Sequence, residues 1–153
     1  MLESRNDPNS PRGGEPGEAS GTASAEWLPM AMGDLSEVAE LEKVCFRDPW
    51  SRASFEAELR AEPTSWCWIV RIGGQLAGYM IAWFIEDEAH LANLAVAPEC
   101  RRHGLGRRLV RAVLEEAARR GVRWIRLEVR ESNAAARALY QALGFRPVGR
   151  RRT

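Results

Sequence analysis

The stretch from Leu91 to Gly121 constrains the fold of this chain more than any other. An apolar run, Leu91–Val96, predicts a buried strand, and Pro98 ends it. A basic turn with two glycines follows, and apolar residues then recur at helical spacing until Gly121, which lies where a helix stop belongs. The apolar helix positions are Leu105, Leu109, Val110, Val113, Leu114 and Ala117. The stretch therefore predicts a strand, a glycine-bearing turn and a helix in direct succession.

The turn has the chemistry of an anion site. Gly104 and Gly106 lack a Cβ atom, so a ligand can approach the backbone closely there. The first N–H groups of a helix point away from it, and the helix dipole favours an anion at this end. Four arginines raise the local positive potential, namely Arg101, Arg102, Arg107 and Arg108. The turn therefore predicts a diphosphate site, while an ordinary strand–helix connection with solvated arginines remains the alternative.

Spacing narrows the kind of diphosphate site. The P-loop pattern requires a lysine, and none occurs in this turn. The dinucleotide fingerprint requires a third glycine where this chain has Leu109. The pattern that fits is Arg/Gln-x-x-Gly-x-Gly/Ala, which begins at Arg101 and ends at Gly106.

A second group of polar residues follows the helix. The segment Val122–Val129 predicts a strand with Ile125 and Leu127 on one face and Arg126 and Glu128 on the other. A carboxylate within a strand is costly unless it is solvated, paired or catalytic. Glu128 is therefore either a working base or a surface residue that pairs with Arg126 or Arg130.

A short helix, Ala134–Leu143, is expected between the capping pair Ser132-Asn133 and the stop at Gly144. Asn133, Arg137 and Tyr140 lie on one side of it, and Tyr140 is either a core residue or a phenolic acid. An amide, a phenol and the carboxylate of Glu128 would then converge near the turn.

The rest of the chain fits a single domain over residues 26–153. Residues 1–25 are rich in Gly, Pro, Ser, Glu and Asn, and we expect them to form a disordered tail. Two helices are expected on either side of Phe46–Ser51, where Phe46 and Trp50 form either an aromatic contact in the core or one wall of a peptide groove. An antiparallel meander with a tight turn at Ile72–Gln75 leads into the central strand.

Composition excludes several classes of protein. The net charge of +1 argues against a nucleic-acid partner or a membrane partner that binds through bulk charge. No apolar run approaches the length of a membrane span, and no signal-peptide core is visible. The three cysteines, Cys45, Cys67 and Cys100, form no metal-ligand spacing with the two histidines, which predicts reduced thiols, no metal and a cytoplasmic location.

Four stretches together resemble the bacterial ribosomal-protein-alanine N-acetyltransferase family within the GNAT superfamily. They are Cys45–Ser51, Asn93–Pro98, Arg102–Arg107 and, most specifically, Leu127–Ala136 with Leu139-Tyr140 and Leu143–Phe145. The resemblance implies an α/β (α+β) GNAT fold, with a mixed, mostly antiparallel sheet flanked by helices. Two parallel strands of that sheet splay apart to admit the pantetheine arm of acetyl-CoA, which is the co-substrate.

The family's roles carry over residue by residue. Leu94, Ala95 and Val96 would bind the acetyl and pantetheine arm through their backbone, and Asn133 would also bind the cofactor. The pyrophosphate would lie on Arg102, His103, Gly104, Leu105, Gly106 and Arg107. Glu128 would be the general base and Tyr140 the general acid, with Phe46 and Trp50 at the acceptor. The acceptor would be a protein N-terminus, typically the alanine of a small-subunit ribosomal protein.

The sequence departs from the family at its C-terminal end. Family members continue beyond the position of Arg152 with an Asn-Tyr-Tyr-like segment and a final strand, whereas this sequence ends at Thr153. We therefore expect an open sheet edge, covered by another chain or left by truncation. Two alternatives stay open, an acetyltransferase of a small amine and a CoA-binding module without turnover, and the Phe46–Ser51 loop favours a protein acceptor over a small amine.

Overall fold

The sheet of this protein has seven strands in the computed structural model, which describes residues 2–5, 25–61, 63–128 and 134–147. Their order is β2-β3-β4-β5-β6-β1-β7. The strands are β1 (Leu2–Arg5), β2 (Ala25–Pro29), β3 (Ser65–Ile72), β4 (Gln75–Ile85), β5 (Glu88–Val96), β6 (Trp124–Leu127) and β7 (Arg146–Pro147). Among the described strands, only β5 and β6 pair in parallel, which confirms the predicted mixed, mostly antiparallel sheet with one parallel pair.

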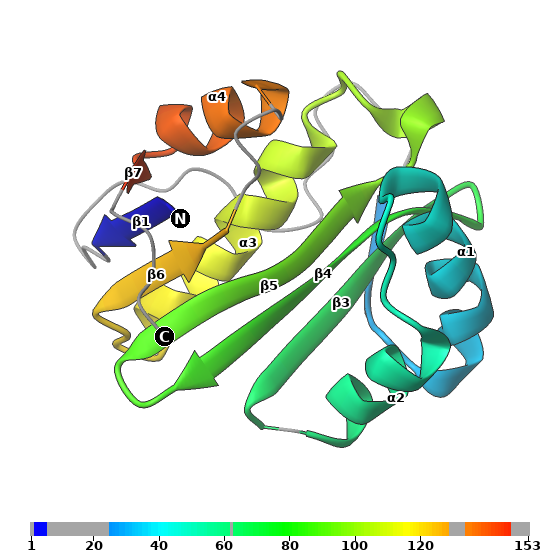
Figure 1. Ribbon diagram of the computed structural model, residues 1–153, viewed down its shortest axis with the longest axis horizontal. Helices are drawn as coiled ribbons and strands as arrows, with labels where there is room; N and C mark the ends of the chain where they lie inside the picture. The colour runs from blue at the N-terminus through cyan, green and yellow to red at the C-terminus, as the bar shows by residue number, and fades with distance from the viewer. Residues whose placement is uncertain (1, 6–24, 62, 129–133, 148–153) are drawn as a thin grey trace.

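Helices cover both faces of the sheet (Figure 1). On one face lie α1 (Leu35–Cys45) and α2 (Arg52–Arg60), and on the other lie α3 (Leu105–Arg119) and α4 (Ala134–Ala142). The central strands therefore bury alternate residues in two clusters: Ile69 packs with α1 and α2, and Val70 packs with α3. Because helices cover both faces of the sheet, the sequences of these strands are nearly continuous apolar runs and do not alternate regularly between apolar and polar residues.

Local signals fixed several element ends. Ser51 caps α2, since its Oγ accepts from the Ser54 backbone N–H at 3.1 Å. Gly73 and Gly74 form the two-residue turn between β3 and β4, both with positive φ. These features agree with the sequence predictions. Two short 3₁₀ segments, Met32–Asp34 and Pro98–Cys100, precede α1 and the glycine turn.

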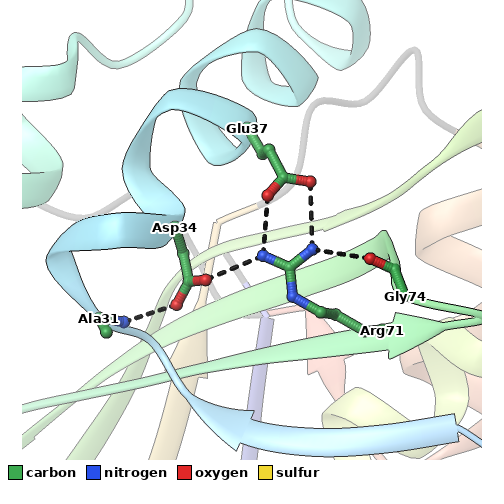
Figure 2. A network of polar contacts seen from close by, with 5 residues as sticks. All are labelled: Ala31, Asp34, Glu37, Arg71 and Gly74. Atoms are coloured by element: carbon green, nitrogen blue, oxygen red, sulfur yellow. Dashed lines mark hydrogen bonds and ion pairs between the residues drawn. The ribbon is translucent and has the colours of Figure 1, made fainter.

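A network around Arg71 ties α1 to the sheet (Figure 2). The Arg71 guanidinium donates to Asp34 at 2.8 Å, to Glu37 at 2.9 and 3.1 Å, and to the Gly74 carbonyl at 3.3 Å. Asp34 also accepts from the Ala31 backbone N–H at 2.8 Å. The hydrogen bonds from Arg71 lower the pKa of Glu37. The network holds the start of α1 against the hairpin of β3 and β4. It therefore fixes the direction of α1, which leads to the Phe46–Ser51 loop.

The amino-terminal segment differs from the sequence expectation. Residues 2–5 form β1, which lies between β6 and β7 (Figure 1), so a disordered tail over residues 1–25 is wrong for this part. Ala25 also belongs to a strand, β2. The structure does not show the expected open sheet edge beside β6, because β1 pairs with all four residues of β6. Composition averaged over 25 residues hid this strand, whose anchor is a single apolar residue, Leu2.

Candidate active site

All four residues of β6 pair in parallel with the first four residues of β5. Their last pair is Leu91↔Leu127, and β5 continues from there to Val96. Over Ala92–Val96, the described part of the chain pairs β5 only with β4. The two strands therefore share one end of the sheet, and the site residues predicted on each lie beyond the point where the pairing stops.

The free edge of β5 presents backbone groups. Ala97 donates its N–H to the Ala77 carbonyl at 2.8 Å, across the β4 side. Because alternate residues of an antiparallel strand point to opposite edges, Leu94 and Val96 direct their backbone groups away from β4. The Val96 carbonyl accepts from Arg101 Nε at 3.1 Å and contacts Cys45 Sγ at 3.7 Å. The N–H groups of Leu94 and Val96 point away from β4, toward the space beyond the end of β6. This is the orientation that they would need to bind the acetyl and pantetheine arm.

The glycine turn has the geometry of a ligand cradle. Gly104 precedes α3 with a φ of 79°, a left-handed conformation that glycine adopts without strain. A Cβ atom on Gly106 would lie 3.5 Å from Leu139 Cδ2 and 3.8 Å from Val96 Cγ2. The first turn of α3 thus packs against both the end of β5 and α4. Its N-terminal backbone N–H groups lie beside the edge of β5 that faces away from β4.

The basic residues of the turn divide into two groups. Arg101 is turned onto Val96 and also donates to Cys45 Sγ at 3.4 Å, and the guanidinium of Arg108 lies 5.4 Å from the centre of the Trp27 ring. Arg102, His103 and Arg107 are exposed. Arg101 is exposed as well, so its charge also lies at this surface, whereas Arg108 is half-buried and directed to Trp27.

Glu128 follows directly after the last residue of β6. Leu127 is buried and Glu128 is exposed, which agrees with the predicted alternation of faces. Arg126, one of the two arginines proposed as a surface partner, instead pairs with Glu3 on β1 and with Glu88 on β5, the latter at 2.7 Å. The other, Arg130, lies outside the described residues. Within the described chain, Glu128 is thus a solvent-accessible carboxylate where β5 and β6 cease to pair.

Tyr140 is a core residue by position. Its side chain is buried in the main apolar cluster, and its ring packs edge-on against Phe145 with centroids 5.9 Å apart. Burial raises the pKa of Tyr140, so its hydroxyl keeps its proton at neutral pH. The neighbouring Leu139 lies near Gly106, which brings α4 beside the glycine turn. Asn133, the predicted amide at the start of α4, lies outside the described residues.

The Phe46–Ser51 loop joins α1 to α2 on the opposite face of the sheet from α3. Phe46 and Trp50 are both half-buried against the cluster under α1 and α2, and Trp50 contacts Phe55 with ring centroids 5.4 Å apart. Each ring therefore combines a core contact with an exposed edge. The loop reaches the free end of β5 through Cys45, whose Sγ contacts the Val96 carbonyl.

Sequence reasoning missed Glu42, which holds this loop in place. Glu42 is 2% exposed and accepts three hydrogen bonds, from the Trp50 backbone N–H at 2.9 Å, from Asn93 Nδ2 at 2.9 Å and from the Tyr79 hydroxyl. It joins the loop to β4 and β5. The available signal was its position on the apolar stripe of α1, four residues after Val38, where a solvated glutamate is not expected.

Two classes of feature are absent from the described ranges. No group of three or more His, Cys, Asp or Glu side chains there could hold a metal ion. Nor does any helix in those ranges have the length and apolar character needed to cross a membrane.

This arrangement is the GNAT fold that the sequence leads us to expect, with one parallel strand pair whose longer strand, β5, leads to a glycine turn at a helix start. Comparison with known proteins agrees, since residues 35–145 match the family model of the acetyltransferase (GNAT) family. The [ribosomal protein bS18]-alanine N-acetyltransferase of Escherichia coli (strain K12) is 39% identical over 124 residues, which cover 78% of this chain and 79% of the relative. The N-alpha-acetyltransferase RimI of Mycobacterium tuberculosis is 41% identical over 125 residues, covering 78% and 77%.

Solved structures give the same result. The crystal structure of the ribosomal-protein-S18-alanine N-acetyltransferase from Escherichia coli superimposes with a TM-score of 0.76 at 34% identity, covering 82% of this chain and 79% of that one. The chain therefore belongs to the GNAT acetyltransferase family and is an acetyl-CoA-dependent N-acetyltransferase. The residues present suit acetyl-CoA, because the cradle at Gly104 and Gly106 lies beside the end of β5 that carries the N–H groups of Leu94 and Val96.

Proposed function

We propose that this chain transfers the acetyl group of acetyl-CoA to the N-terminal α-amine of a protein, and that its acceptor is a small-subunit ribosomal protein that begins with alanine. The observation that carries the proposal is the position of Glu128, which follows the last pair of β5 and β6 directly and remains open to solvent. The names of the relatives at 39% and 41% identity support the choice of acceptor. A ribosomal acceptor would place the protein in the cytoplasm.

Acetyl-CoA would enter along the free edge of β5. Its pyrophosphate would accept hydrogen bonds from the backbone N–H groups of Gly104, Leu105 and Gly106, with the charges of Arg102 and Arg107 and the side chain of His103 exposed around it. The N–H groups of Leu94 and Val96 would hold the pantetheine arm and the acetyl carbonyl. Ala95 contributes differently, since its side chain is buried under α1 and fixes the strand. We further propose that Asn133 binds the cofactor from the start of α4.

Glu128 would act as the general base. The reference pKa of an α-amine is near 8, so the acceptor is largely protonated at neutral pH and must lose a proton before it attacks. An exposed carboxylate can take that proton directly or through one water molecule. The free amine would then attack the thioester carbonyl, whose oxygen gains negative charge opposite the backbone N–H of Val96. The C–S bond breaks as the new amide bond forms.

Tyr140 would act as the general acid. Its phenol is protonated at neutral pH and can give a proton to the departing thiolate, while the raised pKa of Tyr140 makes it a weaker acid and limits its share of the rate. Two protons leave the nitrogen, the first from the ammonium before attack and the second as the tetrahedral intermediate collapses to the amide. Glu128 would pass both to solvent, and Tyr140 would recover its own proton from solvent. The edge-on contact with Phe145 fixes the ring, so the hydroxyl position is set by packing rather than by a flexible side chain.

The Phe46–Ser51 loop would receive the acceptor. Glu42 holds the backbone of this loop at Trp50, and Cys45 brings its first end to Val96. The exposed edges of Phe46 and Trp50 would contact the first residues of the acceptor on the face opposite α3. A wall built from two aromatic side chains suits a peptide better than a small polyamine, since it offers apolar contact along an extended chain. No residue described here favours the small-amine alternative.

The test compares acceptors under one condition. The purified protein is incubated with acetyl-CoA and an excess of a decapeptide that begins with alanine, and thiol release is followed together with peptide mass. Controls are the same peptide with a blocked N-terminus and a panel of small amines. We expect a single acetyl group on the N-terminal residue of the free peptide and none on the blocked one. Acetylation of the small amines with equal or higher kcat/KM would contradict the proposed acceptor.

A further inference from the structure

The strand β5 contains an extra residue opposite β4. Ile81 pairs with Asn93 and the next residue, Ala82, pairs with Leu91, so Ala92 falls between two consecutive pairs of the register. This is a β-bulge, in which two residues of one strand lie opposite one residue of the other. The bulge comes directly after the last residue pair of β5 and β6, and therefore at the start of the part of β5 that carries the proposed cofactor contacts.

The bulge reverses the alternation of side chains along β5. Before it, Ala89 and Leu91 belong to the core cluster under α3. After it, Ala95 belongs to the cluster under α1 and α2, whereas Leu94 and Val96 pack against the α3 cluster. In an unbroken strand Ala95 would lie on the same face as Leu91, because side chains alternate between the faces with a period of two.

The same reversal decides which backbone groups face away from β4. Beyond the bulge, the odd-numbered residues direct their backbone groups to β4, since Ala97 donates its N–H to the Ala77 carbonyl at 2.8 Å. The N–H groups of Leu94 and Val96 therefore point to the side where acetyl-CoA would bind. Without the extra residue the order would be reversed, and the N–H groups of Leu94 and Val96 would pair with β4 instead.

A hydrogen bond to a buried carboxylate holds the bulge in place. Asn93, which directly follows Ala92, donates from Nδ2 to Glu42 of α1 at 2.9 Å. Glu42 is 2% exposed and also accepts from the Trp50 backbone N–H at 2.9 Å and from the Tyr79 hydroxyl. If the bulge lay later in the strand, Asn93 would face α3, and the buried carboxylate would lose one of its donors. The contact with Glu42 therefore favours a single position of the bulge.

We propose that Asn93 is a positioning residue of the acetyl transfer: its hydrogen bond to Glu42 fixes the bulge of β5, and the bulge aims the N–H groups of Leu94 and Val96 at the acetyl thioester. Asn93 acts through the backbone of β5 and not through contact with the reacting atoms. The inference rests on the proposed use of these two N–H groups for acetyl-CoA, and it is independent of the identity of the acceptor.

The experiment measures the hydrogen bonding of the acetyl carbonyl directly. Acetyl-CoA with ¹³C at that carbonyl is bound at saturating concentration, and its band is recorded by isotope-edited infrared spectroscopy. In wild type the band should lie at a lower frequency than in free acetyl-CoA, because the N–H groups polarise the C=O bond. In Asn93→Ala the band should return toward its free position, and kcat should fall by roughly 10–100-fold, since small displacements of positioning groups have effects of this size. KM for the acceptor that wild type acetylates should change much less than kcat.

Tyr79→Phe is the matched control. It removes another hydrogen bond to the same carboxylate, but Tyr79 lies on β4 opposite Ala95, beyond the bulge. This variant should lose stability and keep both the infrared band and kcat per folded molecule. Equal changes in the two variants, or a wild-type band and kcat in Asn93→Ala, would overturn the positioning role. A wild-type band at the free position would instead refute the proposed N–H contacts with acetyl-CoA, and the inference with them.

An exchange of groups tests the same hydrogen bond if Asn93→Ala does not fold. Asn93→Asp places a second carboxyl group against Glu42 and should lower kcat as strongly as Asn93→Ala. Glu42→Gln added to Asn93→Asp restores one donor and one acceptor with their places exchanged, so kcat should recover by at least about fivefold over Asn93→Asp alone. A double variant no more active than Asn93→Asp would contradict a hydrogen bond that positions β5.

Discussion

Loss of the Glu42 carboxylate should be among the most damaging single changes outside the reaction itself. Glu42→Ala removes the shared acceptor of the Trp50 backbone N–H, the Asn93 amide and the Tyr79 hydroxyl. Tyr79 is completely buried, so its hydroxyl would be left without water. Trp50 and Asn93 are half-buried and can recover part of their hydrogen bonding from solvent.

The magnitude follows from these three donors. A buried donor left unpaired costs about 1–3 kcal/mol, and hydrogen bonds to a charged acceptor lie at the upper end of the range. With one fully buried and two half-buried donors, Glu42→Ala should lower the free energy of unfolding by about 3–5 kcal/mol. Glu42→Gln keeps the volume and one oxygen but turns an NH₂ group toward one donor, so we expect a loss of about 1–2 kcal/mol.

Urea unfolding monitored by tryptophan fluorescence measures both variants. Glu40→Ala is the matched control, because Glu40 lies on the same helix and pairs with Lys43 at the surface, where the two side chains are 74% and 63% exposed. That variant should change stability by no more than about 0.5 kcal/mol. Tyr79→Phe added to Glu42→Ala should cost almost nothing further, because the hydroxyl it removes has already lost its partner.

The same variants test the link to function. Because Glu42 holds the loop at Trp50, Glu42→Gln should raise KM for an alanine-starting peptide more than it raises KM for acetyl-CoA. The reasoning would be refuted if Glu42→Ala were no less stable than Glu40→Ala, or if Tyr79→Phe were fully additive with it. Either result would mean that the three hydrogen bonds do not share one buried acceptor.

Three further predictions concern the reaction site. Gly104→Val forces a β-branched residue into a φ of 79°, so acetyl-CoA affinity measured by calorimetry should fall about tenfold or more in a folded protein, and an unchanged Kd would exclude the turn as the cofactor cradle. Glu128→Gln should lower kcat by about 10²–10⁴-fold with acetyl-CoA affinity retained, and an unaltered pH–rate profile would show that Glu128 is only a solvated surface residue. Tyr140→Phe should lower kcat by a smaller factor and cost about 1 kcal/mol of stability, whereas full turnover under chemistry-limited conditions would make Tyr140 a core residue only.

Much of this fold could be predicted because its signals are local. The spacing from Leu105 to Ala117 gave α3, and Gly73-Gly74 gave the hairpin turn, each from residues that contact one another within the same element. The glycine turn was likewise predictable, since Gly104 takes the positive φ that its position before α3 demands. In all three cases the local preference and the tertiary structure agree.

Other features depended on contacts between distant segments. β1 has four residues and is held by pairing with a strand more than a hundred positions away, which no local pattern reveals. Glu42 looked like an ordinary helix glutamate until Tyr79, Asn93 and Trp50 were seen around it. The orientation of Arg108 toward a tryptophan of β2 likewise depends on a contact between distant segments.

The most direct test of the account is a crystal structure with a bisubstrate analogue, in which CoA is joined to the N-terminal amine of an alanine-starting peptide. We predict the pyrophosphate within hydrogen-bond distance of the backbone N–H groups at Gly104–Gly106, and the pantetheine arm along Leu94–Val96. The linked amine should lie within reach of the Glu128 carboxylate, directly or through one water molecule, and the peptide should run past Trp50. A CoA moiety bound away from the glycine turn, or a peptide on the α3 face of the sheet, would contradict the proposed mechanism.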